Sequence, residues 1–254
     1  MELRVEGRGP AAPFLGARDL FETERDLSLP VHVRVRSDPD ERTWAGHYDD
    51  HHVLNISQQA ATSVMARELA LHEFAHMLRY EEEHPSHFLD LREVVYLALA
   101  GRRVERRVLQ HCQVLANHVK DVYADDITLS VGPTDKLLTF LESELAAAIA
   151  DNPSSGGIGG HRITAGSDPR LTVVNAAFAI ALLERNDAVP TDHHIYKLAQ
   201  AASEDAPDVD FEVFKDRFKS LARDPDESEC RRVLVDLVTD YVDAHDSTTG
   251  PAAD

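Results

Sequence analysis

The chain has 254 residues and a formal net charge of −19, because 26 lysine and arginine residues face 45 aspartate and glutamate residues. Its length suits one large domain or two modest ones with a sizeable hydrophobic core. Such an acidic protein repels phosphates, which argues against a general nucleic-acid-binding surface.

Lysine occurs only five times, so arginine supplies most of the positive charge. A lysine-poor, acidic surface is typical of proteins from a high-salt cytoplasm, where ions screen the self-repulsion. Cys112 and Cys230 stand far apart in no metal-binding pattern and are expected to be buried thiols in a reducing compartment. Neither a signal peptide nor an apolar run of bilayer-spanning length is apparent, so we expect a soluble, cytoplasmic protein with no membrane partner.

The first 60 residues predict a small sheet. Period-two alternation over residues 31–36 places Val31, Val33 and Val35 on the buried face of a strand. Further strands are expected over residues 3–5, 43–48 and 52–57. Residues 1–20 otherwise indicate only turns rich in glycine and proline.

A helix is predicted over residues 58–80, with Ser57 as its N-cap. It contains His72-Glu-Phe-Ala-His76, an HExxH motif among apolar neighbours. Residues four apart lie on one side of a helix, so the two imidazoles can hold one zinc ion at about 2.0–2.1 Å each. Glu73 is offset by about 100° and suits a general base that takes a proton from a zinc-activated water. The alternative is an amphipathic helix with two solvated histidines; the apolar neighbours favour the metal.

A polar loop broken at Pro85 follows the motif, and helices are predicted over residues 88–100, ended by Gly101, and 103–127. The second of these helices carries Asp121-Val-Tyr-Ala-Asp125, whose two carboxylates lie four residues apart on one face. A catalytic zinc takes three protein ligands and leaves one position open. The long helix is therefore the expected source of the third ligand.

The order of a small sheet, an HExxH helix and an acidic helix resembles the zincin metallopeptidases. Asp121-x-x-Ala-Asp125 resembles the Glu-x-x-Ala-Asp motif of the gluzincin branch, with Asp in place of Glu. The resemblance implies that Asp121 binds zinc, that Asp125 hydrogen-bonds a zinc-binding histidine, and that the shorter Asp brings the helix closer. It also implies an antiparallel edge strand, Trp44–Tyr48 or the strand from His52, that pairs with an extended peptide. The sequence also looks like a family of salt-adapted archaeal HExxH proteins, for which the resemblance implies a fold but no substrate.

His118 competes with Asp121 for the third position, because it lies three residues earlier on the same side of the helix. In that case Asp121 or Asp125 would hold the His118 tautomer from behind. If Asp121 binds the metal, His118 is a candidate to stabilise the oxyanion on the attacked carbonyl. His84 and His87 in the polar loop are the next candidates.

The other histidines and the basic start of the long helix have simpler interpretations. Surface positions are expected for His47, His51, His52, His193 and His194. His111 lies on the same face as His118 and either lines a cleft or is a partly buried helix residue. The arginines at the start of the helix are expected to pair with nearby acids: Arg102, Arg103, Arg106 and Arg107.

The C-terminal half predicts helices only, over residues 135–150, 168–185, 192–204, 211–222 and 227–243. Between the first two, the Gly/Ser-rich segment 151–160 is a linker, a lid or a surface loop. We therefore expect a mostly helical α+β fold: a zincin-like catalytic core over 1–130, a helical subdomain packed on it over 131–244, and a disordered tail over 245–254.

These features predict a cytoplasmic, zinc-dependent peptidase acting on a peptide or protein substrate, with His72, His76 and Asp121 as zinc ligands and Glu73 as the general base. The alternative from another class is a catalytically inactive zincin-fold module that binds metal or another protein. A helical scaffold without metal is a third hypothesis, which elemental analysis would separate from the other two.

Overall fold

A mostly helical α+β fold with a small N-terminal sheet is confirmed by the computed structural model, which describes residues 1–39, 41–151 and 168–246. The chain divides into two compact units. Unit 1 consists of Met1–Phe88 and Tyr123–Leu137; unit 2 consists of Leu89–Val122 and the described residues from Leu138 onward.

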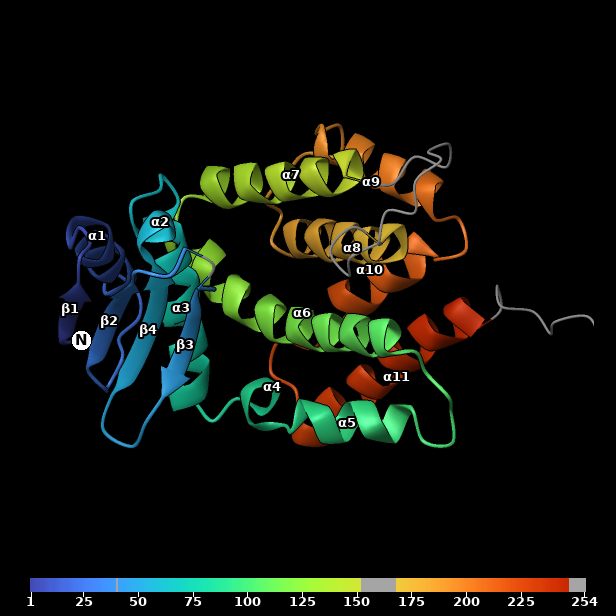
Figure 1. Ribbon diagram of the computed structural model, residues 1–254, viewed down its shortest axis with the longest axis horizontal. Helices are drawn as coiled ribbons and strands as arrows, with labels where there is room; N and C mark the ends of the chain where they lie inside the picture. Colours follow the sequence, from blue (N-terminus) through green and yellow to red (C-terminus); the bar gives the residue numbers. More distant parts are fainter. Residues whose placement is uncertain (40, 152–167, 247–254) are drawn as a thin grey trace, which may run out of the picture. The chain divides into compact units, whose positions relative to one another are not determined.

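Unit 1 contains all four strands of the sheet and the first helices. Its elements are β1 (Leu3–Gly7), α1 (Ala12–Phe21), β2 (Val31–Arg36), β3 (Trp44–His47), β4 (His52–Ser57), α2 (Gln58–Ala61), α3 (Ala66–Glu81) and α4 (Pro85–Phe88). The strands lie in the order β1-β2-β4-β3 (Figure 1). β1, β2 and β4 are parallel, whereas β3 is antiparallel to β4 at the edge. Because β4 lies inside the sheet, the edge strand is β3 and not the strand from His52.

One face of the sheet is covered by α1 and α3. Val31, Val33 and Val35 point into this core, as the alternation predicted. Phe21 of α1 and Phe74 of α3 meet edge to face, with ring centroids 5.9 Å apart. Helix α1 was not predicted, although a proline at its start and apolar Phe14, Ala17 and Phe21 at helical spacing, all buried in the structure, are helix signals.

The prediction of a single helix over 58–80 is wrong, because residues 62–65 separate two helices, α2 and α3. Ser57 is an N-cap, but of α2, and its hydroxyl accepts from the backbone N–H of Ala60 at 3.1 Å. The hydroxyls of Thr62 and Ser63 donate to the carbonyls of Gln58 and Ala60. Such local side-chain bonds compete with helix continuation, which accounts for the break.

Two further helix boundaries differ from the prediction. Pro85 starts the short helix α4 rather than breaking a loop, which suits the fixed φ of proline at a first helical position. The helix expected over 88–100 is α5 (Leu91–Ala98), since Asp90 accepts from the N–H groups of Arg92 and Glu93 and caps it.

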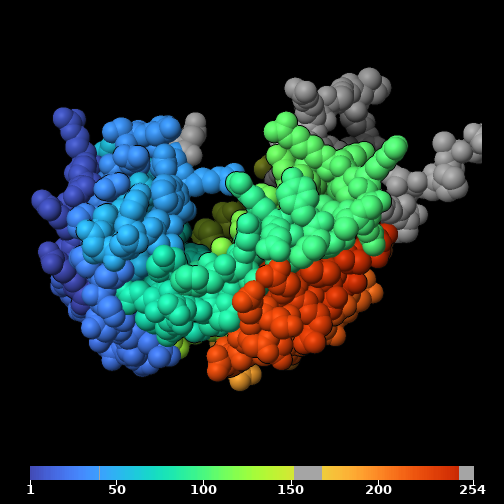
Figure 2. All heavy atoms as spheres, turned by 90° about the horizontal axis from the view of Figure 1, so that it is seen from below, coloured from blue at the N-terminus to red at the C-terminus, as the bar shows by residue number. Residues whose placement is uncertain are grey.

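Among the described residues of unit 2, all regular secondary-structure elements are helices. Its remaining elements are α6 (Arg106–Val131) and α7 (Thr134–Ala150), which both extend into unit 1, and α8 (Pro169–Arg185), α9 (Ile195–Asp205), α10 (Phe211–Lys219) and α11 (Glu227–Asp246). The apolar helix α8 is buried among its neighbours, and α9 and α10 pack against it. α5 packs against α11, whose red surface borders green surface from the α5 region in Figure 2.

The division into units does not follow the expected boundary near residue 130. Residues 89–122 precede that boundary but belong to the helical unit 2, and residues 131–137 stay with the sheet in unit 1. The predicted start of the disordered tail at residue 245 is too early, because His245 is buried and α11 runs to Asp246. Residues 247–254 and 152–160 lie outside the described residues. Among the described helices, none combines the length and apolar character that crossing a membrane requires.

Candidate metal centre

Helix α3 presents His72 and His76 on one side while most of its surface is buried. Leu71, Phe74 and Met77 are buried in the core of unit 1. Both histidines keep an intermediate exposure, and Glu73 next to His72 is only 7 % exposed. Because the residues around the motif are packed in the core, α3 is held in place and the two imidazoles project from a rigid helix.

Helix α6 brings its acidic turn to α3 through a close packing contact. Ala124 and Ile127 belong to the same core cluster as the buried residues of α3. The guanidinium of Arg79 on α3 donates to the carbonyl oxygen of Tyr123 at 3.0 Å. Ala124 is small and fully buried in this shared core.

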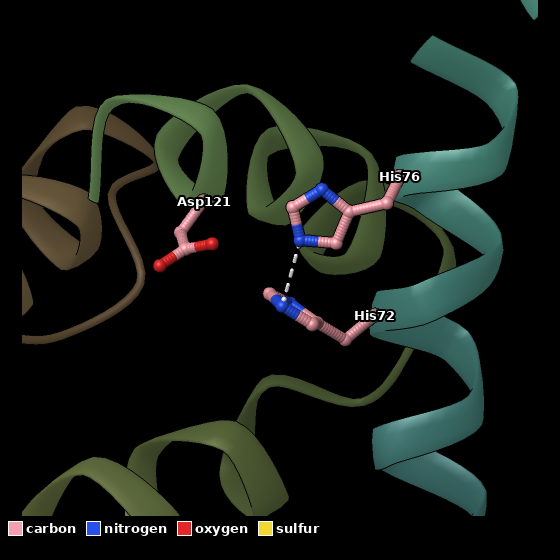
Figure 3. Close-up of side chains that lie close together, drawn as sticks. All are labelled: His72, His76 and Asp121. Atoms are coloured by element: carbon pink, nitrogen blue, oxygen red, sulfur yellow. Dashed lines mark hydrogen bonds between the residues drawn. The ribbon is translucent and has the colours of Figure 1, made fainter. Parts of the chain in front are cut away.

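His72, His76 and Asp121 form a group whose potential ligand atoms all lie within 4.8 Å of one another. Figure 3 shows the two imidazoles leaving α3 and the carboxylate of Asp121 facing them from α6. Asp121 lies one helical turn before Asp125 on the continuous helix α6, so the same packing places both. Two imidazole nitrogens and one carboxylate oxygen are a donor set that zinc accepts at a catalytic site.

Asp125 lies behind His72. Its Oδ1 accepts a hydrogen bond from Nδ1 of His72 at 2.7 Å, and the carboxylate is 4 % exposed. A carboxylate oxygen can only accept, so Nδ1 of His72 carries the proton. In the neutral imidazole, Nε2 then presents its lone pair to the centre, which is the orientation a metal ligand needs.

The spacing of the two imidazoles tests whether a metal ion fits. Nε2 of His72 and Nε2 of His76 lie 3.0 Å apart. Two nitrogens bound to one tetrahedral zinc at about 2.0–2.1 Å lie roughly 3.3 Å apart. Two lone pairs at such a distance repel unless a cation or a proton lies between them. The geometry of this chain therefore fits a metal ion held by His72, His76 and Asp121.

His118, the alternative third ligand, has other partners within unit 2. Its Nε2 bonds Oδ1 of Asn175 at 2.8 Å, and its ring stacks on Phe178 with centroids 4.2 Å apart. Its Nδ1 lies 3.5 Å from Oδ2 of Asp121. The metal-compatible group of the described residues contains Asp121 and not His118. A role of His118 in stabilising an oxyanion stays a prediction.

His84 and His87 lie behind His76 rather than in the centre. Nε2 of His87 contacts Nδ1 of His76 at 2.8 Å, on the side of the ring away from His72. Ser86, which was not predicted as a site residue, is fully buried and hydrogen-bonds both His84 and His87. In the sequence, the only feature that could have indicated this role of Ser86 is its position between two histidines just after the HExxH helix.

The expectation of a surface position is wrong for His52, which is fully buried at the start of β4. Its register partner Val31 shows that it points to the helix-covered face, where its Nε2 lies 3.1 Å from Glu81. Burial lowers the pKa of His52, and the nearby carboxylate of Glu81 opposes that shift. His47 is half-buried and stacks on Tyr80 with centroids 4.1 Å apart.

The other predicted positions fall in unit 2. His111 is buried and its Nδ1 lies 2.6 Å from the hydroxyl of Tyr241, so it is a core residue. Two of the four arginines pair with acids: Arg102, in the segment before α6, with Asp243, and Arg107, in the first turn of α6, with Asp168. Both cysteines are free and buried, as expected, and burial raises the pKa of the Cys112 thiol to about 12.

The fold and the centre together define a mostly helical α+β protein with a candidate metal site between its HExxH helix and α6. The chain belongs to a family of unknown function, DUF5781, whose model matches residues 1–243. No curated protein and no solved structure matches it.

Proposed function

We propose that this protein is a cytoplasmic, zinc-dependent peptidase. The observation that carries the proposal is the convergence of His72, His76 and Asp121 within 4.8 Å. The resemblance of the motif and of Asp121-x-x-Ala-Asp125 to the gluzincin peptidases supports the same chemistry. Asp125 is hydrogen-bonded to His72 as that resemblance implies, at 2.7 Å.

The residues of this chain have distinct tasks in the proposed reaction. A bound zinc would lower the pKa of water towards about 7 and polarise the substrate carbonyl. Glu73 takes a proton from the attacking water while the water oxygen forms a bond to the carbonyl carbon. Glu73 then gives that proton to the departing amine nitrogen as the C–N bond breaks. Asp125 keeps His72 oriented throughout.

The edge strand β3 offers a place for the substrate backbone. β3 pairs with β4 on one side only, and it packs against α3, the helix that carries the motif. An extended peptide can add to such an edge through main-chain hydrogen bonds. We propose a peptide or protein substrate, bound along β3.

The first experiment measures bound metal and hydrolysis together. Protein purified from metal-replete medium is expected to contain zinc; less than about one ion in ten chains would contradict the proposal. Glu73→Gln is expected to retain zinc but to hydrolyse a peptide library about 10²–10⁴-fold more slowly, because it lacks the general base.

Glu68→Gln is the matched control for this experiment. Glu68 is also on α3 and equally buried at 7 % exposure, but it pairs with Arg67 and is not part of the metal-compatible group. Its variant is expected to hydrolyse peptides within a few-fold of the parent. If the parent and Glu73→Gln bind zinc and are equally inert, the protein is the metal-holding, inactive module instead.

A further inference from the structure

A continuous chain of hydrogen bonds runs from His76 into the interior of unit 1. Nδ1 of His76 lies 2.8 Å from Nε2 of His87, and Nδ1 of His87 lies 2.8 Å from Oγ of Ser86. The same Oγ lies 2.8 Å from Nδ1 of His84. The chain ends in the core, where the ring of His84 packs on Tyr123 with centroids 4.5 Å apart.

The turn after α3 brings these residues back beside His76. Glu83 has a positive φ of 51°, and the N–H of His84 donates to the carbonyl of Arg79 at 2.9 Å. These two features form the Schellman end of a helix, usually made by glycine. A non-glycine residue pays about 1–2 kcal/mol for this conformation, so the surrounding contacts must hold the turn in place.

One backbone group sets the direction of every bond in the chain. The N–H of Ser86 points at Nδ1 of His84 at 3.3 Å, and a backbone N–H can only donate. Nδ1 of His84 is therefore an acceptor, so the hydroxyl of Ser86 also donates to it. The oxygen of Ser86 then accepts from Nδ1–H of His87, which leaves the lone pair of His87 on Nε2.

We infer that His84, Ser86 and His87 form a relay that fixes the tautomer and ring orientation of His76. Nε2 of His87 accepts from Nδ1–H of His76, so the lone pair of His76 lies on Nε2 and faces the centre. His72 obtains the same tautomer from a carboxylate, which can only accept. An imidazole can donate or accept, so His87 performs this task only because Ser86 and His84 set its own tautomer. All three are positioning residues.

The inference rests on the proposed function for the purpose of the relay, but its geometry can be tested without metal. Long-range ¹H–¹⁵N spectra of the metal-free protein at about pH 8, where unperturbed imidazoles are neutral, distinguish the two tautomers of each histidine. In this metal-free protein the relay predicts protonated Nδ1 for His87 and protonated Nε2 for His84. His76 is read in the zinc-bound protein, where protonated Nδ1 is expected, because without the ion a proton must lie between Nε2 of His72 and Nε2 of His76, which are 3.0 Å apart. Protonated Nε2 at His87 would overturn the relay.

A second measurement asks whether the relay matters for metal binding. Ser86→Ala leaves His87 in place but removes the acceptor for its Nδ1–H. The zinc dissociation constant, measured by chelator competition, is expected to rise about 10–100-fold, the usual effect of losing a group that orients a ligand. Ser130→Ala is the control, because among the described contacts the Ser130 hydroxyl bonds only the Ile127 carbonyl of its own helix. In this variant the zinc dissociation constant is expected to change by about twofold or less.

A double variant separates the relay from a general loss of packing at the buried Ser86. The amide oxygen of His87→Gln can accept from His76 without help from Ser86. Adding Ser86→Ala to His87→Gln is therefore expected to change zinc affinity by about twofold or less. If Ser86→Ala weakens binding equally in both backgrounds, or in neither, the relay is overturned. If the parent protein binds no zinc, the proposed function fails, and the tautomers alone decide the relay.

Discussion

Asp121 and His118 lie less than one turn apart on α6, yet their surroundings differ. Asp121 joins the two histidines of α3 in the metal-compatible group. His118 has a hydrogen bond to Asn175 and a stacked ring at Phe178 that hold it without any metal. At the residue scale, these contacts favour Asp121 as the third ligand, with His118 beside its carboxylate.

Replacing these two residues tests that assignment. Asp121→Ala is expected to weaken zinc binding by more than the 10–100-fold that is typical of an orienting residue, because a ligand is lost. His118→Ala is expected to stay within that range, since His118 would act on the metal only through Asp121, whose Oδ2 lies 3.5 Å from Nδ1 of His118. Chelator competition on both variants gives the two affinities. The reverse order would favour a three-histidine centre.

At the element scale, the sheet that carries β3 depends on close pairing of its strands. Gly7, the last residue of β1, pairs with Val35 of β2 and has a φ of +98°. A Cβ added there would meet the carbonyl oxygen of Val35 at 2.4 Å. The atom that the added Cβ would meet belongs to the backbone of Val35, so it cannot rotate away as a side chain could. Only glycine therefore fits at this position.

Gly7→Ala is therefore expected to destabilise unit 1 strongly. The matched control is Gly101→Ala, because Gly101 has a φ of +78° but nothing within 4 Å of an added Cβ. The control should cost only the backbone strain, about 1–2 kcal/mol, whereas Gly7→Ala should cost about 1–3 kcal/mol more.

Urea unfolding measures both costs. Fluorescence of the single tryptophan, Trp44 in β3, reports on unit 1, and far-UV circular dichroism reports on the helices. Equal free-energy losses for the two variants would contradict the close approach of β1 and β2.

At the scale of the whole molecule, the net charge of −19 is the dominant property. Self-repulsion of like charges destabilises a compact chain, and salt screens it, since the Debye length falls from about 10 Å at 0.1 M to about 3 Å at 1 M. Many of the ion pairs described are local, such as Arg18 with Asp19 and Arg231 with Glu227, and offset little of this excess.

The thermal midpoint is accordingly expected to rise as KCl is increased from about 0.1 M to 1 M. Sucrose at equal osmolality is the control, because it favours compact states without screening charges. A midpoint that rises equally in both solutes, or falls in KCl, would argue against salt adaptation of this surface.

Local patterns in the sequence were sufficient for the features that depend on spacing along one element. The four-residue separations of His72 and His76, and of Asp121 and Asp125, place each pair on one helix face whatever the rest of the chain does. Alternation likewise predicted the inward face of β2, with Val33 in the core. The same local logic missed α1 and extended a single helix through Thr62, where side-chain hydroxyls end α2.

Features that depend on contacts between distant segments were decided only by the tertiary structure. The burial of His52 follows from the place of β4 inside the sheet, which no alternation in its own sequence reveals. The presence of Asp121, and not His118, in the metal-compatible group depends on how α6 packs on α3, where Ala124 joins the shared core.

The contact between His87 and His76 is the last feature of this kind, because the turn at Glu83 brings His87 back to His76. The sequence therefore determined which chemical groups this protein carries and on which helix faces they lie. The tertiary structure decided which of them meet, because the meeting depends on long-range packing that a local period does not encode.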